Sequence, residues 1–216
     1  MIALLLMGPL ASAAYLLVVV LPEFFASYSG QKTTKKLQRL INPKGDVKRL
    51  SDDMSRSNSV ETRRRLAEEL LEHEDFDEAE KLFRESRVGM FEHDPVMMLG
   101  QARALFGLER YTDVIRVLDE LTDVNPGFQN QDGHLLYARA HGELGLHDKA
   151  IAEFEAVTEY FAGPEANVFY AQYLEAHGEA EKAGNIYKDI VKVAELSPAH
   201  YRRTHRIWIK MAQQKI

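Results

Sequence analysis

The chain begins with a long apolar stretch. No residue from Ile2 to Leu21 is charged, and eleven of these twenty residues are Leu, Ile or Val. At ~1.5 Å per residue, a helix of this length spans ~30 Å, the thickness of a bilayer's hydrocarbon core. The pattern predicts one transmembrane helix within residues 1–25. Two alternatives are a buried core helix and a signal peptide cleaved at Ala11-Ser12-Ala13. The apolar run continues beyond that site and no cation precedes it, which opposes cleavage.

A basic segment follows the apolar run, and residues 26–58 are expected to form a juxtamembrane linker. From Lys32 to Arg65 there are eleven Lys or Arg residues against four acidic ones. Because cations beside a membrane span resist translocation, this side is expected to be cytoplasmic and the N-terminus to lie outside. The same cations could bind anionic lipid headgroups, or they could only set the topology.

The rest of the chain has an apolar pattern that repeats. A small residue recurs at Ala79, Val114, Ala150 and Ala183, at spacings of 35, 36 and 33 residues. Twelve residues before each of these stands an alanine, and the four are Ala67, Ala102, Ala138 and Ala171. Only a small side chain lets two helices approach within about 8–10 Å where they cross. The spacing therefore predicts four helical hairpins over residues 59–196.

Helix-start signals agree with this division. Asp94-Pro95 and Ser197-Pro198 each combine a capping residue with a first-turn proline, and Gly163-Pro164 serves the fourth hairpin. Residues 197–216 are expected to form one further helix that caps the apolar end of the stack, as a solenoid requires. The residues expected to cover that end are Tyr201, Ile207, Trp208 and Met211.

The period and the small and aromatic positions resemble those of the tetratricopeptide repeat (TPR) family. The third copy, Leu135-Leu136-Tyr137-Ala138 through Phe154, carries the likeness most closely, and the second copy is degenerate. The resemblance implies an all-α, right-handed solenoid that binds proteins. The whole layout looks like that of uncharacterised, divergent TPR proteins anchored in bacterial membranes, which implies a bacterial inner membrane as the location.

Composition excludes several other functions. From Leu66 onward there are sixteen Lys or Arg residues against twenty-eight acidic ones, so nucleic acid is a poor partner. The chain has no cysteine, and its eight histidines are not spaced as metal ligands. Motifs of nucleotide-binding loops, serine hydrolases and zinc proteases are absent. We therefore expect no enzyme activity, cofactor, metal or small-molecule substrate.

A partner peptide is expected to dock on the first helices of the hairpins. Residues that follow the crossing alanines, or precede them by three, should face a common groove. They are Arg64, Glu68, Leu99, Arg103, Leu135, Arg139, Val168 and Gln172. Such a groove is an apolar strip with two central arginines, which suits a peptide that carries an acid beside apolar residues. Alternatively, Arg103 and Arg139 pair with acids inside the stack.

The sequence therefore predicts a membrane-tethered scaffold that recruits or assembles proteins at the cytoplasmic face of a bacterial inner membrane. The alternative is a structural module that associates with itself through its apolar anchor and open repeat surface.

Overall fold

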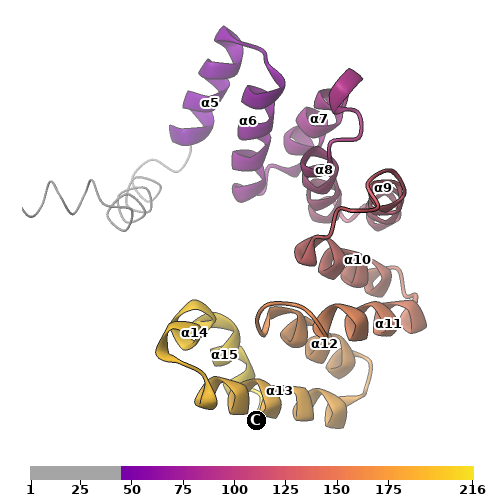
Figure 1. Ribbon diagram of the computed structural model, residues 1–216, viewed down its shortest axis with the longest axis vertical. Helices are drawn as coiled ribbons and strands as arrows, with labels where there is room; N and C mark the ends of the chain where they lie inside the picture. The colour runs from indigo at the N-terminus through magenta and orange to yellow at the C-terminus, as the bar shows by residue number, and fades with distance from the viewer. Residues whose placement is uncertain (1–44) are drawn as a thin grey trace, which may run out of the picture. The chain divides into compact units, whose positions relative to one another are not determined.

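The computed structural model describes residues 45–216, and these belong to two compact units, with the division between Asn58 and Ser59. Figure 1 labels the elements. The first unit contributes α5 (Gly45–Arg56), whose Asp46 binds Arg49 one turn later. The second unit contains α6 (Val60–Glu72), α7 (Phe76–Ser86), the 3-10 turn η2 (Gly89–Phe91), α8 (Pro95–Gly107), α9 (Tyr111–Val124), α10 (Gln131–Glu143), α11 (His147–Thr158), α12 (Glu165–Ala176), α13 (Ala180–Leu196), α14 (Ala199–Thr204) and α15 (Arg206–Gln213).

Residues 59–196 form a stack of four antiparallel hairpins. The pairs are α6 with α7, α8 with α9, α10 with α11, and α12 with α13. The first helices of the pairs also contact one another in order, so they form an inner layer, and the second helices form an outer layer (Figure 1). The all-α solenoid expected from the sequence is confirmed.

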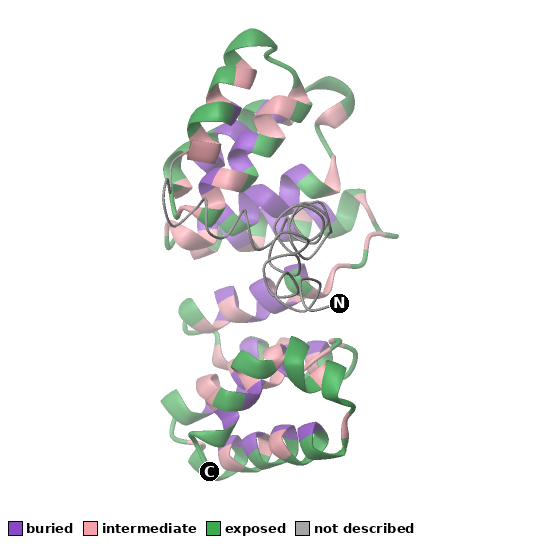
Figure 2. Ribbon diagram, turned by 90° about the vertical axis from the view of Figure 1, so that its left-hand side faces the viewer, coloured by how far each residue is buried: buried purple, intermediate pink, exposed green. Residues whose placement is uncertain are grey.

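The predicted crossing residues lie where the helices of each hairpin meet. Each of Ala67, Ala102, Ala138 and Ala171 is 0% exposed, and their partners in the second helices are at most 1% exposed. Figure 2 shows buried residues along the faces where the helices pack together. A larger side chain would force the backbones apart at these positions.

All four hairpins turn in the same way. The second residue after each first helix has a positive φ, and these residues are Glu74, Glu109, Gly145 and Gly178. In each turn the backbone amide of the residue after this one donates to the carbonyl oxygen five residues earlier, as the amide of Asp75 does to Leu70. This is the hydrogen bond of a Schellman motif, which satisfies a carbonyl that the helix end leaves free. Glycine adopts the left-handed conformation without steric cost, so the two glutamates are strained where the two glycines are not.

The helix starts follow local capping chemistry. The Ser59 side chain and the Thr62 side chain each accept from the other residue's amide, which forms a capping box for α6. Asp94 accepts from the amides of Val96 and Met97, and Pro95 occupies the first turn of α8 as predicted. Ser197 does not cap the following helix; its hydroxyl donates back to the carbonyl of Val193.

The prediction of a single capping helix is wrong in one respect. The structure has two short helices there, α14 and α15, with a break between them at His205. The His205 ring packs against Tyr201 and against the backbone of Gly163, a tertiary contact that local sequence does not reveal. Trp208 and Met211 pack on the core of the last hairpins as expected. Ile207, however, is 71% exposed.

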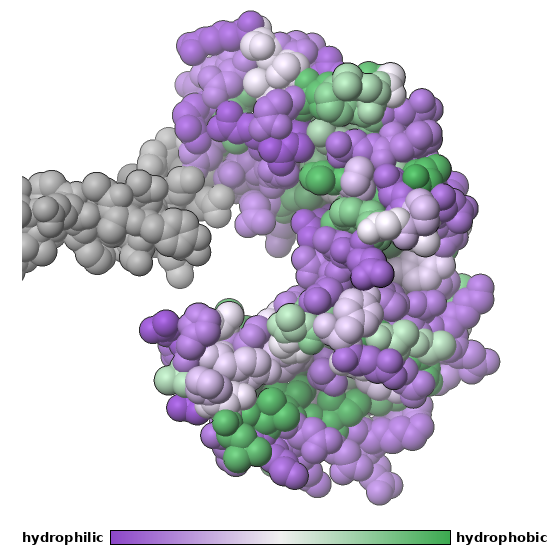
Figure 3. Space-filling view, in the orientation of Figure 1, coloured by the Kyte–Doolittle hydropathy of each residue, from purple (hydrophilic) through white to green (hydrophobic). Residues whose placement is uncertain are grey.

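The C-terminal end of the stack therefore stays partly uncovered. Val193 and Leu196 in α13 are 50% and 81% exposed. Figure 3 shows apolar surface over this end of α13. These side chains and Ile207 are available for contact with another surface.

The predicted membrane anchor, residues 1–25, lies outside the described residues, as does most of the predicted linker. Among residues 45–216, no helix combines the length and the apolar character needed to cross a bilayer.

Candidate functional site

The inner helices carry all eight residues that the sequence placed in a groove, but the structure does not expose them equally. Leu99, Leu135 and Val168 are 7%, 4% and 0% exposed. Leu135 and Val168 belong to the core that joins the third and fourth hairpins, and Leu99 lies against the backbone of Gly133. The expected apolar strip is wrong at these positions, because the side chains pack between neighbouring inner helices.

Two arginines of the set pair with acids of the stack. Arg64 binds Glu61 and Glu68 on its own helix, at 2.8 and 2.5 Å. The side chain of Arg103 reaches from α8 to Asp132 at the start of α10, with 3.3 Å between nitrogen and oxygen. Both side chains of this second pair are about half exposed, so solvent screens the attraction.

Arg139 is held differently, between two aromatic rings. Its guanidinium carbon lies 4.5 Å from the ring centre of Phe106 in α8 and 4.3 Å from that of Phe169 in α12. Both distances lie within the ~6 Å range of a cation–π contact. Burial lowers the pKa of Arg139, and the nearby carboxylates of Glu143 and Glu165 act in the opposite direction. One arginine thus links three successive inner helices.

The aromatic contacts continue beyond the arginine on both sides. Tyr111 meets Phe106 edge to face, with ring centres 5.2 Å apart. Trp208 of α15 lies 5.4 Å from Phe169. We call Tyr111, Phe106, Arg139, Phe169 and Trp208 the inner ladder. All five side chains are partly exposed, so together they give the inner layer a continuous apolar and cationic strip.

Acidic groups flank the inner ladder. Burial raises the pKa of Glu165, Asp132 raises it further, and Arg139 lowers it. A carboxylate from a partner would therefore meet like charges here, while apolar side chains would meet rings. The strip favours apolar or aromatic groups over the acidic residue that the sequence suggested.

Sequence reasoning missed Phe106 and Phe169. A signal was present, because Phe106 follows Arg103 by three residues and Phe169 precedes Gln172 by three, which places each pair on one helix face. This spacing could not show that both rings contact Arg139, because the three residues belong to three different repeats.

A polar network joins the first two hairpins. The buried Gln101 amide donates to Glu80 at 2.9 Å and accepts from Arg87 at 2.8 Å. Arg87 also binds Glu120 in α9, which connects the helices α7, α8 and α9. Because every member has a partner, the network fixes the register between the two hairpins.

Two histidines of the described residues are hydrogen-bonded to tyrosine or glutamate side chains. His134 lies 2.7 Å from Glu153 and 2.6 Å from the Tyr160 hydroxyl, and His147 lies 3.0 Å from the Tyr173 hydroxyl. Among residues 45–216, no three His, Asp or Glu side chains are grouped to hold a metal ion.

Comparison with known proteins identifies the fold. No family model matches the sequence, and no curated protein matches it either. Several solved structures do match. The thermophilic TPR protein TTC0263 of Thermus thermophilus is 17% identical, with a TM-score of 0.62 over 85% of this chain and 96% of that one. MamA is 17% identical, with a TM-score of 0.58 over 78% and 95% of the two chains. YrrB, described as a TPR protein with an unusual peptide-binding site, is 17% identical, with a TM-score of 0.55 over 83% and 86%. The chain therefore has the fold of the TPR proteins.

Proposed function

We propose that this protein is a membrane-tethered scaffold that binds a segment of a partner protein along its inner layer. The observation that carries the proposal is the inner ladder, which presents partly exposed rings and one arginine across three repeats. Aromatic residues and arginine are enriched where proteins bind one another. The TPR fold and the peptide-binding site attributed to YrrB support a peptide partner.

The partner segment is expected to be apolar or aromatic where it meets the ladder. Arg103 and Asp132 stand beside the ladder with side chains 47% and 60% exposed, and they offer one charge of each sign to the flanks of such a segment. Charges at the rim of an interface mainly set the association rate and the orientation, whereas buried rings supply affinity.

The proposed location is the cytoplasmic face of a bacterial inner membrane. The uncharged run from Ile2 to Leu21 and the cations that follow it support a single span with the N-terminus outside. Such a tether would confine the repeats to the membrane surface and raise the local concentration of their partners.

Charge reversal on the inner layer tests the proposal. Native membranes would be solubilised and the tagged full-length chain captured as wild type, Arg103→Glu or Lys81→Glu. Lys81 is the matched control, because it lies on the outer helix α7, is 50% exposed and also has one ion-pair partner. We expect the same co-purifying proteins with wild type and Lys81→Glu, and at least a fivefold loss with Arg103→Glu. Equal recovery with both variants would contradict binding at the inner layer.

The tether has a test of its own. The full-length chain should resist extraction by alkaline carbonate, and protease added outside intact cells should leave the repeats uncut. Release by carbonate would exclude the anchor, and cleavage from outside would reverse the orientation.

A second function is favoured by the uncovered apolar end. Val193, Leu196 and Ile207 could join two copies of the chain and so make it a self-associating module. Light scattering of the detergent-solubilised chain decides this. A scaffold without its partner should have the mass of a monomer both as wild type and as Leu196→Glu. A dimer that Leu196→Glu dissociates would support self-association.

A further inference from the structure

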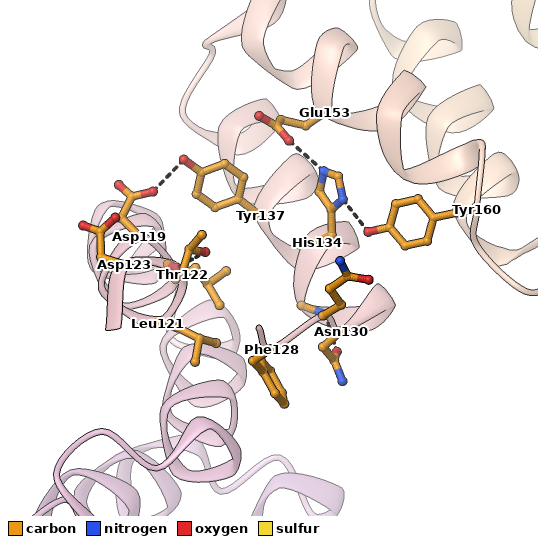
Figure 4. Close-up of a pocket in the computed structure, with 13 residues that line it drawn as sticks. Asp119, Leu121, Thr122, Asp123, Phe128, Asn130, His134, Tyr137, Glu153 and Tyr160 are labelled. Atoms are coloured by element: carbon orange, nitrogen blue, oxygen red, sulfur yellow. Dashed lines mark hydrogen bonds and ion pairs between the residues drawn. The ribbon is translucent and has the colours of Figure 1, made fainter. Parts of the chain in front are cut away.

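A cavity of about 760 Å³ lies between the outer helices α9 and α11, and none of the inner-ladder residues lines it. Its floor is the face of α10 that carries His134 and Tyr137 (Figure 4). Asp119 and Asp123 from α9 stand on one side, and Glu153 and Tyr160 from the α11 side stand opposite. The volume is in the range of sites that bind a ligand or a few side chains.

Hydrogen bonds hold the walls of this cavity. The Tyr137 hydroxyl donates to Asp119 at 2.7 Å, and His134 joins Glu153 to Tyr160 through its two ring nitrogens. These contacts orient the tyrosine and histidine rings, so the shape does not depend on a ligand.

The cavity is acidic and aromatic. None of the residues that line it is Lys or Arg, whereas three are Asp or Glu. Among the described residues, Asp123 has neither an ion pair nor a hydrogen bond through its side chain. A free carboxylate beside aromatic faces is the environment that a guanidinium group prefers, because it can pair with the acid and stack on a ring.

A second cavity of about 790 Å³ adjoins the first, and Asp119 and Asp123 line both. Ile115, Val124, Leu144 and Leu146 give it an apolar wall. His141 also lines it. This side chain is only 3% exposed, and its Nδ1 has no hydrogen-bond partner within the described part of the chain. A buried ring nitrogen without a partner is costly.

We propose that these two cavities form one docking site on the outer layer for a partner segment that carries an arginine beside an apolar residue. The arginine enters the acidic cavity, stacks on the ring of Tyr137, and pairs with Asp123. The apolar side chain enters the second cavity. This site is separate from the inner ladder, so the scaffold has two surfaces and can hold two segments at once.

The probe is the peptide GLRLG-NH2 with fluorescein on its N-terminal amine, and the readout is fluorescence anisotropy with the full-length chain in detergent micelles. Micelles without protein give the background. Replacing the arginine by citrulline keeps the shape and removes the charge, and this should weaken binding by about tenfold or more. Replacing both leucines by serine should weaken it several-fold. Binding that is insensitive to citrulline, or absent at millimolar peptide, would overturn the proposal.

Two double variants test the location. Asp119→Asn with Asp123→Asn removes both charges and leaves an oxygen that still accepts from Tyr137. It should weaken binding by about tenfold or more. Asp77→Asn with Asp189→Asn is the control, because it makes the same change of charge at exposed positions that line neither cavity. Equal affinity of the two double variants would overturn the proposal. Co-purification of partner proteins reports on the inner layer and peptide anisotropy reports on the outer cavities, so a failure at the inner layer and a failure here can be told apart.

Discussion

Arg103 and Arg139 provide a direct test of the inner layer, because each follows a crossing alanine and the sequence alone treats them alike. Arg139 lies between two rings, and each desolvated cation–π contact is worth roughly 0.5–2 kcal/mol. The Arg139→Ala substitution should therefore lower the free energy of unfolding by about 2 kcal/mol. The Arg103→Ala substitution removes only one exposed ion pair, which contributes ~0.5 kcal/mol or less.

The measurement is thermal and urea unfolding of the full-length chain, followed by circular dichroism at 222 nm. For a domain of this size, ~2 kcal/mol corresponds to a fall in melting temperature of about 4–8 °C. Arg139→Lys should fall between wild type and Arg139→Ala, since lysine keeps the charge but lacks the planar group that stacks. If Arg139→Ala melted like Arg103→Ala, the ladder would not contribute to stability and the described contact would be wrong.

Four further changes test the packing and the turns. Ala138→Leu should cost ~1–3 kcal/mol, measured by the same urea unfolding, because a fully buried crossing has no room for a larger side chain. Gly100→Ala should cost a similar amount, since its new methyl group would overlap the ring of Phe83, which is 1% exposed. Glu109→Gly should stabilise the protein by up to ~1 kcal/mol in a melting experiment, because it relieves a positive φ of 58°. Burial and a nearby glutamate raise the pKa of Tyr187 to about 12, so its contribution to stability is complete below pH 10 and is lost as the pH rises towards 12. A titration of absorbance at 295 nm should show a late phase, because burial also raises the pKa of Tyr170 to about 12, and Tyr187→Phe should reduce this phase by one tyrosine.

The repeats were predictable because their signal is local and recurs. A small residue twelve positions after an alanine reports a helix crossing within one hairpin, and Asp94-Pro95 reports a helix start from adjacent residues. Neither inference needs the position of another repeat. The structure confirms both.

The site was less predictable because its contacts join different repeats. The burial of Val168 depends on how closely α10 and α12 approach, and the clamp on Arg139 depends on rings from the neighbouring hairpins. The outer cavities depend on the space between α9 and α11. The break at His205 depends on the loop at Gly163. Such spacings follow from packing between repeats, which a single repeat's pattern does not encode.

The central claim is that a partner lies along the inner layer. Site-specific photocrosslinking in cells tests it most directly, with a benzophenone amino acid placed in the full-length chain at Gln172 on the inner helix α12 or at Lys188 on the outer helix α13. The account predicts a defined partner adduct from Gln172 that Arg103→Glu weakens, and no such adduct from Lys188. The same adduct from both positions, or from Lys188 alone, would contradict it.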